Sequence, residues 1–430
     1  MLRRDLLRAL GVTPLALPLL SACGFEPTSG SSGGTTSVEL VTSDLPRSKG
    51  DPAAAGDAAA SIADLATRLY DELGREAGNL AFSPYSIAVA LAMTVNGARG
   101  TTAEEMLDVL AVEDLATFNG GLNALSQHLE GLAGKQENYD GEPLEVVLDT
   151  ANSLWGQEGV TWQKPFLDVL AKDYGTGMRT VDYAGATEQA HGLINAWTAE
   201  QTRDKIPELI PDGVLDALTR LVLVNAIYLK APWAVAFEES RTQDAAFTLR
   251  DGSRVDVPMM ASVEGDYGIK VGEGWQAVRV EYAGFELAMT VVIPDDIEEL
   301  PHLTALTRWE PDGTVALRLP RWKVRTEAML KETLVALGMP TPFSESAADF
   351  SGMTHEAELV IAAVVHEAFV AVDEKGTEAA AATAVVMRDT SAGVTPEVVT
   401  VDRPFLYVIH DVEHGTPLFV GRVDDPSQES

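Results

Sequence analysis

The segment from Gly376 to Val386 limits the fold more than any other, because it consists almost entirely of small or β-branched residues. Alanine is the best helix former, so an ordinary helix is one interpretation. The segment has no apolar stripe at helical spacing, however, and it ends in β-branched residues, which favour strands. With a period of two, one face carries only small or apolar side chains, those of Thr377, Ala379, Ala381, Thr383 and Val385. We therefore expect a strand that fits between two existing strands without unpacking them.

The rest of the chain predicts helices first and strands later. Ile62, Leu65, Leu69 and Leu73 recur at helical spacing. Unbroken apolar runs at residues 221–229 and 288–294 indicate strands that are buried on both faces. Further strands are expected at residues 315–320, 363–372, 398–401, 405–410 and 418–423. This order predicts an α+β protein with helices packed on large, mostly antiparallel β-sheets.

The composition excludes some classes of partner. The 430 residues carry a formal net charge of -34, and 46% of them are hydrophobic, which is enough for a sizeable core. Binding to nucleic acid needs a basic surface, and an anionic membrane surface repels an acidic protein. We therefore expect no nucleic-acid partner and no general attraction to membranes.

The N-terminus predicts export and attachment to a membrane. Residues 1–8 are basic, and the apolar stretch at residues 9–20 is too short to span a bilayer. Residues 20–23, Leu-Ser-Ala-Cys, resemble a bacterial lipobox, in which the peptide is cut before the cysteine and the cysteine receives a lipid. Cys23 is the one cysteine of the chain, so no intramolecular disulfide can form. We expect an extracytoplasmic protein that is held at a bacterial membrane through lipidated Cys23.

Three parts of the chain follow from these patterns. Residues 1–22 are expected to be a lipoprotein signal peptide. Residues 23–57 are rich in Gly, Ser, Thr and Pro and predict a flexible tether. Residues 58–430 show no domain-sized break and predict one large folded domain.

Several motifs occur in the order that they have in the serpins, a family of protease-trapping inhibitors. Residues 373–383 resemble the hinge of that family, and residues 401–405 resemble its C-terminal signature. The resemblance covers about residues 60–428, with further matches at residues 79–87, 152–155, 194–197, 224–230, 258–260, 319–322 and 349–353. It implies an α+β serpin fold with an exposed reactive loop.

The resemblance also implies a suicide-substrate mechanism. A target serine protease attacks the loop and forms an acyl-enzyme, and the freed loop inserts into the central sheet as an antiparallel strand that disrupts the trapped protease. Thr377 would enter the sheet first and is expected to lie near the surface until then. The chain would be no enzyme, need no cofactor and act as a monomer. The hinge would consist of Glu374, Gly376, Thr377, Ala379, Ala381 and Thr383.

The resemblance further implies a hydrogen-bonded polar cluster beneath the place where the strands of the sheet part, formed by Ser83, Ser86, Asn225 and His366. The competing interpretation of these residue types is a Ser-His-Asp hydrolase triad. Neither serine lies in a Gly-x-Ser-x-Gly elbow, and Pro84 is typical of a helix start after Ser83. The sequence therefore favours a structural cluster.

A zinc site is the other enzymatic interpretation. His410 and His414 are four residues apart, with Asp411 and Glu413 between them, which on a helix would suit a zinc ion. A strand-like run precedes them and Gly-Thr-Pro follows them, so a hairpin turn is the better interpretation. We therefore expect solvated turn residues and no metal.

The family's spacing, counted from Gly376, places the attacked bond between Thr390 and Ser391, which would suit a protease with a small specificity pocket. The segment is longer than the common form of the family. Arg388–Asp389, which would suit a trypsin-like protease, therefore stays a second candidate. A non-inhibitory serpin, acting as a binding or chaperone-like protein, also stays open. Such members tend to carry bulky, charged or proline residues in the hinge, and this chain has none on the inward face.

Overall fold

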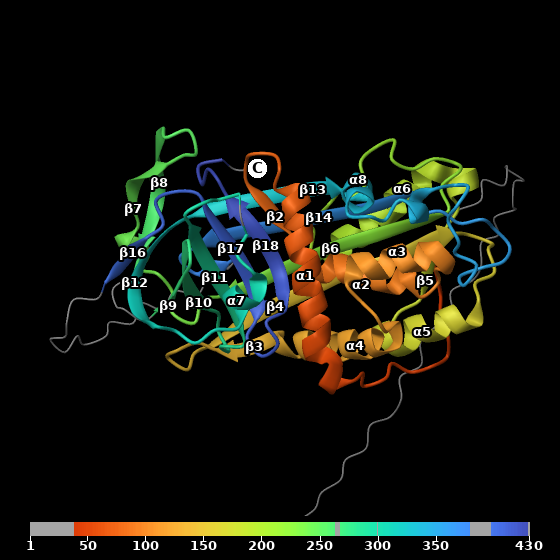
Figure 1. Ribbon diagram of the computed structural model, residues 1–430, viewed down its shortest axis with the longest axis horizontal. Coiled ribbons are helices and arrows are strands. Elements are labelled where there is room, and N and C mark those ends of the chain that lie inside the picture. Colours follow the sequence, from red (N-terminus) through yellow and green to blue (C-terminus); the bar gives the residue numbers. More distant parts are fainter. Residues whose placement is uncertain (1–37, 263–266, 299, 379–396, 429–430) are drawn as a thin grey trace, which may run out of the picture. The chain divides into compact units, whose positions relative to one another are not determined.

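The computed structural model describes residues 38–262, 267–298, 300–378 and 397–428. The predicted signal peptide with the lipidation site Cys23 lies outside these residues. So do the hinge and bond residues Ala379, Ala381, Thr383, Arg388, Asp389, Thr390 and Ser391. Figure 1 shows the arrangement of the described elements.

Most of the helices lie in the first half of the chain, as the sequence predicts. α1 buries Ile62, Leu65 and Leu69 on one face, which explains their spacing. None of the described helices is both long and apolar enough to cross a membrane. The α-helices are α1 (Ala55–Leu73), α2 (Pro84–Val95), α3 (Gly100–Leu110), α4 (Leu115–Leu132), α5 (Lys164–Tyr174), α6 (Tyr183–Gln201), α7 (Leu303–Thr307) and α8 (Lys331–Ala336). Short 3-10 turns lie at Pro52–Ala54, Glu239–Arg241 and Thr341–Phe343.

Two large sheets form the rest of the described domain and confirm the α+β fold. The first sheet has the order β1 (Glu39–Val41), β5 (Met178–Val181), β4 (Pro143–Gln157), β6 (Leu221–Pro232), β15 (Gly376–Thr377), β14 (Ala363–Asp373) and β13 (Trp322–Met329), and β3 (Gly134–Glu137) pairs with β4. The second sheet has the order β2 (Leu80–Phe82), β18 (Pro417–Val423), β17 (Phe405–Asp411), β11 (Leu287–Pro294), β10 (Trp275–Glu281), β9 (Tyr267–Gly272), β12 (Gly313–Pro320), β8 (Arg254–Ala261) and β7 (Gln243–Thr248), and β16 (Val398–Thr400) pairs with β12.

The unbroken apolar run of β6 has a structural reason, because its two faces line two different cores. Leu221 and Leu223 belong to the main core, which also takes in residues of α1, α2 and the second sheet. The alternate residues Val222 and Val224 pack in a smaller core with Ile194 of α6. A strand that is buried on both faces favours apolar residues on both, and the predicted two-sided burial of β6 is confirmed.

The folded domain begins earlier than the composition suggests. A tether is predicted through residue 57, but β1 at Glu39–Val41 pairs with β5. The backbone N–H of Ser48 donates to the carbonyl oxygen of Lys172 at 2.7 Å. Gly50 has a φ of 69°, and a Cβ there would lie 2.4 Å from the backbone of α4. Gly50 thus allows the close approach of this segment to α4. The tether prediction is wrong for residues 38–57, because they are part of the folded domain.

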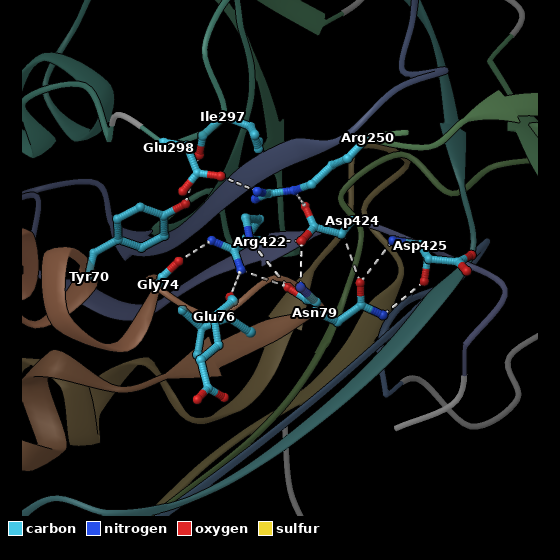
Figure 2. Close-up of polar contacts among 12 residues, drawn as sticks. Tyr70, Gly74, Glu76, Asn79, Arg250, Ile297, Glu298, Arg422, Asp424 and Asp425 are labelled. Carbon is cyan, nitrogen blue, oxygen red and sulfur yellow. Dashed lines mark hydrogen bonds and ion pairs between the residues drawn. The ribbon is translucent and has the colours of Figure 1, made fainter. Parts of the chain in front are cut away.

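The last strand is fastened to the loop that follows α1 (Figure 2). The Arg422 side chain of β18 is 1% exposed and forms an ion pair of 3.2 Å with Asp424. It also donates, at distances between 2.5 and 3.2 Å, to the backbone carbonyls of Gly74, Glu76 and Gly78. A buried guanidinium is tolerated when its donors are satisfied, so this network joins the C-terminal strand to the N-terminal helix.

Candidate functional site

The first sheet contains a pair of parallel strands with a third strand between them at one end. β6 pairs with β14 in parallel over residues 222–227 and 363–368. Beyond this stretch β15 lies between the two strands and runs antiparallel to both. Thr377 of β15 is the register partner of Val372 on β14 and of Ala231 on β6. Figure 1 shows β6 and β14 side by side in the sheet. The short antiparallel strand β15 has begun between them at one end.

Gly376 permits this entry because it has no side chain. Its φ of 151° is one that other residues rarely adopt. A Cβ at this position would lie 2.2 Å from the carbonyl oxygen of Ala231 and 2.7 Å from Cα of Pro232. The backbones of β15 and β6 can therefore approach only with glycine here.

Glu374 anchors the turn that precedes β15. Its side chain is 2% exposed, and Arg321 donates to one carboxylate oxygen from Nε at 2.8 Å and from Nη2 at 2.5 Å. Thr242 donates a further hydrogen bond to the same oxygen. Burial alone would raise the pKa of Glu374, but the hydrogen bonds from Arg321 and Thr242 outweigh it and hold that pKa below its usual value. The carboxylate is thus a charged anchor for the turn.

Thr377 is already part of the sheet. It is 1% exposed, and its Oγ1 lies 2.6 Å from Oη of Tyr282. Tyr282 in turn stacks on Trp233, with ring centroids 4.5 Å apart. The expectation that Thr377 lies near the surface is therefore wrong, because β15 has entered the sheet as far as this residue.

Glu378 is held where the described chain leaves the sheet. It has a φ of 49°, in the left-handed region, and its backbone N–H donates to the carbonyl of Ala371 at 2.8 Å. Its carboxylate accepts a hydrogen bond of 2.5 Å from Nζ of Lys205. Burial raises the pKa of Tyr228, and the nearby Glu378 carboxylate raises it further. An extension of β15 beyond Thr377 would require Glu378 to leave its left-handed backbone conformation and its contact with Lys205.

The structure brings the four predicted polar residues together across the boundary between β6 and β14. His366 and Asn225 are register partners on these strands, and both are fully buried. Nε2 of His366 accepts a hydrogen bond of 3.0 Å from the backbone N–H of Ser83, so Nδ1 carries the proton and donates to Oδ1 of Asn225. His366 is therefore neutral, and its ring links β14 to Asn225 on β6 and to the backbone of Ser83.

Residues at the start of α2 and on β4 complete this polar cluster. Ser83 is the N-cap of α2, and its Oγ accepts from the N–H of Ser86 at 3.2 Å. Oγ of Ser86 accepts from Nδ2 of Asn225 at 2.8 Å and donates to Oδ1 of Asn152 at 2.6 Å. Asn152 is the register partner of Asn225 on β4. Every side chain of the cluster is thus hydrogen-bonded, which burial requires.

The arrangement holds strands together and has no hydrolase geometry. Ser83 Oγ faces the first turn of α2, and His366 accepts from the Ser83 backbone rather than from its hydroxyl. The expectation of solvated turn residues is wrong for His410, because it belongs to β17 and is fully buried, with Nε2 3.0 Å from Oγ1 of Thr290. His414 is in the turn between β17 and β18 and lies beside His128 instead.

Six residues of the site did not follow from the sequence. Asn152 and Arg321 stand in segments that resemble the family, but the pattern does not say what they contact. The other four meet the hinge and the turn before it only through sheet register and packing: Lys205, Trp233, Thr242 and Tyr282. A search for polar residues at the same register level on neighbouring strands would have found Asn152 once the strand pairing was known.

The cluster makes stability depend on pH. Burial lowers the pKa of His366 to about 3, whereas an unfolded histidine titrates near ~6.5. As the pH falls below ~6.5, the unfolded chain binds a proton that the folded chain does not, so the free energy of unfolding decreases. We predict that His366→Gln removes this dependence. Between about pH 6 and about pH 5, its free energy of unfolding falls less steeply than that of wild type, by ~1.4 kcal/mol per pH unit.

Urea unfolding of both proteins at the two pH values measures this difference. Burial also lowers the pKa of His410, to about 4, and raises that of Glu367, to about 7. These two groups act with opposite signs but are the same in both proteins, so they cancel in the comparison. Equal slopes for wild type and variant contradict a neutral, buried His366.

Comparison with known proteins agrees with this geometry. A family model described as "Serpin (serine protease inhibitor)" matches residues 60–426. The human leukocyte elastase inhibitor is 35% identical over 370 residues, which covers 81% of this chain and 94% of the relative. Ipis-1 of Ixodes persulcatus is 35% identical over 382 residues, which covers 84% of this chain and 97% of the relative.

Solved structures show the same fold. The native structure of the thermophilic serpin Tengpin matches with a TM-score of 0.75 and 26% identity, over 85% of this chain and 94% of that one. Serpin48 of the insect Tenebrio molitor matches with a TM-score of 0.73 and 30% identity, over 87% of this chain and 99% of that one. Since the family model spans most of the chain and these relatives align almost end to end, the protein belongs to the serpin family.

Proposed function

We propose that this serpin inhibits serine proteases as a suicide substrate, by cleavage of its reactive loop and insertion of the loop into the first sheet. The observation that carries the proposal is β15, an antiparallel strand that has begun between the parallel strands β6 and β14. The named relatives include inhibitors of elastase, which supports a protease as the partner. Membership of the family also supports a role as inhibitor and not as catalyst.

The register of β15 predicts how many residues of the loop would insert between β6 and β14. Thr377 pairs with Val372, and each step along the loop is one step back along β14, so Val386 would face Ala363, the first residue of β14. By the same count along β6, Met387 would face Leu221, the first residue of that strand. Both candidate bonds lie just beyond Met387. A protease attached there would be carried to the opposite end of strands β6 and β14 from Glu374.

The side chains of the loop suit this register. Thr377, Val372 and Ala231 share the face toward the main core, so Ala379 and Ala381 would enter the same core. Thr383 would lie opposite both His366 and Asn225, by the same count. Its hydroxyl group would then face the polar cluster at the level where insertion separates these two residues. The small alanines would thus face the apolar core, and the Thr383 hydroxyl would face the polar cluster.

Insertion would also add backbone hydrogen bonds. The closed sheet has one parallel ladder between β6 and β14, and this ladder covers six residue pairs. A strand between them would replace it with two antiparallel ladders, which are slightly more stable per residue. The inserted side chains would be buried as well. The free energy of this step would drive the distortion of the attached protease.

An arginine on the inward face tests insertion. At residue 381 it would be buried opposite Ala368 and Ile227, which are both almost fully buried, and an unpaired guanidinium there costs several kcal/mol. We predict that Ala381→Arg is cleaved at the same bond as wild type but acts as a substrate. The measurement is the fraction of protease in a complex that survives boiling in detergent.

Ala381→Ser is the matched control, because it keeps a small side chain at the same position and should form the complex as wild type does. Equal complex formation by Ala381→Arg would exclude insertion in this register. If wild type itself forms no complex and its melting temperature does not rise after loop cleavage, the protein is instead a non-inhibitory serpin with a binding or chaperone-like role.

We propose Thr390–Ser391 as the reactive bond, with Arg388–Asp389 as the alternative. The residue before the bond fills the specificity pocket of the protease, so the two bonds imply different enzymes. Thr390→Arg should strengthen inhibition of trypsin-like proteases and weaken that of elastase-like ones. Inhibition constants and mass spectrometry of the released loop check this. Loss of all inhibition in Arg388→Ala would assign the bond to Arg388 instead.

We also propose that the protein is monomeric, extracytoplasmic and attached to a bacterial membrane by a lipid on Cys23. The support is the sequence at residues 1–23, since the lipobox provides the attachment point. We predict that Cys23→Ser moves the protein from the membrane fraction to the soluble fraction of cells. Ser21→Thr, which keeps Cys23, is a control that should stay with the membrane. Retention of Cys23→Ser in the membrane fraction would contradict the lipid anchor.

A further inference from the structure

Two histidines and a glutamate from distant parts of the chain converge at the outer end of the second sheet. His128 comes from α4, and Glu413 and His414 come from the turn between β17 and β18. One donor atom from each of the three residues can be chosen such that all lie within 4.8 Å of one another. The rings of His128 and His414 meet edge to face, with centroids 5.1 Å apart. These three residues belong neither to the hinge nor to the polar cluster.

The turn holds its two donors in place. Asp411 is fully buried and accepts hydrogen bonds of 2.7 Å from the backbone N–H groups of His414 and Thr416. Gly415 follows with a φ of 73°, and a Cβ there would lie 2.6 Å from Cγ of Arg308. These contacts direct His414 toward α4 and leave the Glu413 side chain 63% exposed and free to adjust.

The distances suit a small transition-metal ion after a modest adjustment. Nδ1 of His128 lies 3.6 Å from Oε2 of Glu413, and Nε2 of His414 lies 3.9 Å from Oε1 of the same carboxylate. Donors at about 2.0 to 2.2 Å from a tetrahedral zinc ion lie roughly 3.4 Å apart. Rotation of the exposed Glu413 side chain can shorten both of its distances, and the three donor atoms already lie within 4.8 Å of one another.

Asp411 supplies the outer contact that a zinc-bound histidine needs. Its Oδ2 lies 3.6 Å from Nε2 of His128, a buried atom for which the described residues provide no hydrogen-bond partner. A proton on Nε2 of His128 would face this buried carboxylate and leave the lone pair of Nδ1 toward Glu413, whose Oε2 lies 3.6 Å from Nδ1. Carboxylate contacts of this kind orient histidine ligands in zinc proteins.

We propose that Nδ1 of His128, a carboxylate oxygen of Glu413 and Nε2 of His414 bind a divalent transition metal of the zinc type, with the fourth position open to water. Two imidazoles and one carboxylate are the donor set of three-ligand zinc sites. Hard cations such as Mg²⁺ and Ca²⁺ prefer oxygen donors and should not bind. The metal would join α4 to the hairpin of β17 and β18 and stabilise the folded protein by linkage.

A second group, His191 with Glu208 and Asp212, provides an internal control. It has one imidazole, and Nε2 of His191 is engaged with the carbonyl oxygen of Ile210 at 2.6 Å. Asp212 is 91% exposed. This group therefore lacks both the second nitrogen donor and the buried outer carboxylate, and we expect it to bind zinc much more weakly.

The test is titration of the chelator-treated full chain with ZnCl₂ by calorimetry at about pH 8, where protons compete little with the metal for imidazole nitrogens. We expect one zinc ion per chain, a higher melting temperature with zinc, and no response to MgCl₂. His414→Ala and Glu413→Gln should each weaken binding at least ~10-fold. His191→Gln should leave it unchanged.

Cobalt(II) serves as a spectroscopic probe of the same site. Its absorption should be that of a tetrahedral or five-coordinate ion with nitrogen and oxygen ligands, and it should disappear in His414→Ala. A thiolate charge-transfer band would assign the metal to Cys23 instead and overturn the proposal. So would zinc affinity that is unchanged in His414→Ala and Glu413→Gln, or that is lost in His191→Gln. Circular dichroism of each variant shows that a loss of binding is not a loss of folding.

Discussion

The parallel contact between β6 and β14 is the interaction on which the rest of the structure depends. It is a ladder of six residue pairs in the middle of the first sheet, with a core on each face. β15 already separates the two strands at one end. If β6 and β14 parted further, only the ladder between them would be lost, and the backbone groups freed on both strands could pair with a strand placed between them.

The polar cluster gives this boundary a defined closed position. An apolar contact between β6 and β14 would tolerate sliding, but the hydrogen bonds of His366 with Asn225 and Ser83 fit one register. Each buried polar group would cost about 1–3 kcal/mol if its partner were removed. The cluster therefore opposes separation of β6 and β14.

Three carboxylates beside this boundary are each paired with a cation. The chain has 65 acidic and 31 basic residues, so most carboxylates have no cation of their own. Near the boundary, however, Glu374 is paired with Arg321, Glu378 with Lys205, and Glu367 with Arg325. Burial still raises the pKa of Glu367 to about 7. Pairing matters most here because unpaired carboxylates would be buried against β6 and β14.

The sequence by itself determined which segments form elements: the apolar run of β6 requires burial on two faces, and Ser83-Pro84 begins α2. Tertiary structure decided which groups meet. The burial of Thr377, the place of Asn152 in the polar cluster and the meeting of His128 with His414 depend on strand register and packing between residues far apart in the chain. Local periodicity reports the exposure of a face, but only long-range pairing determines what lies against it.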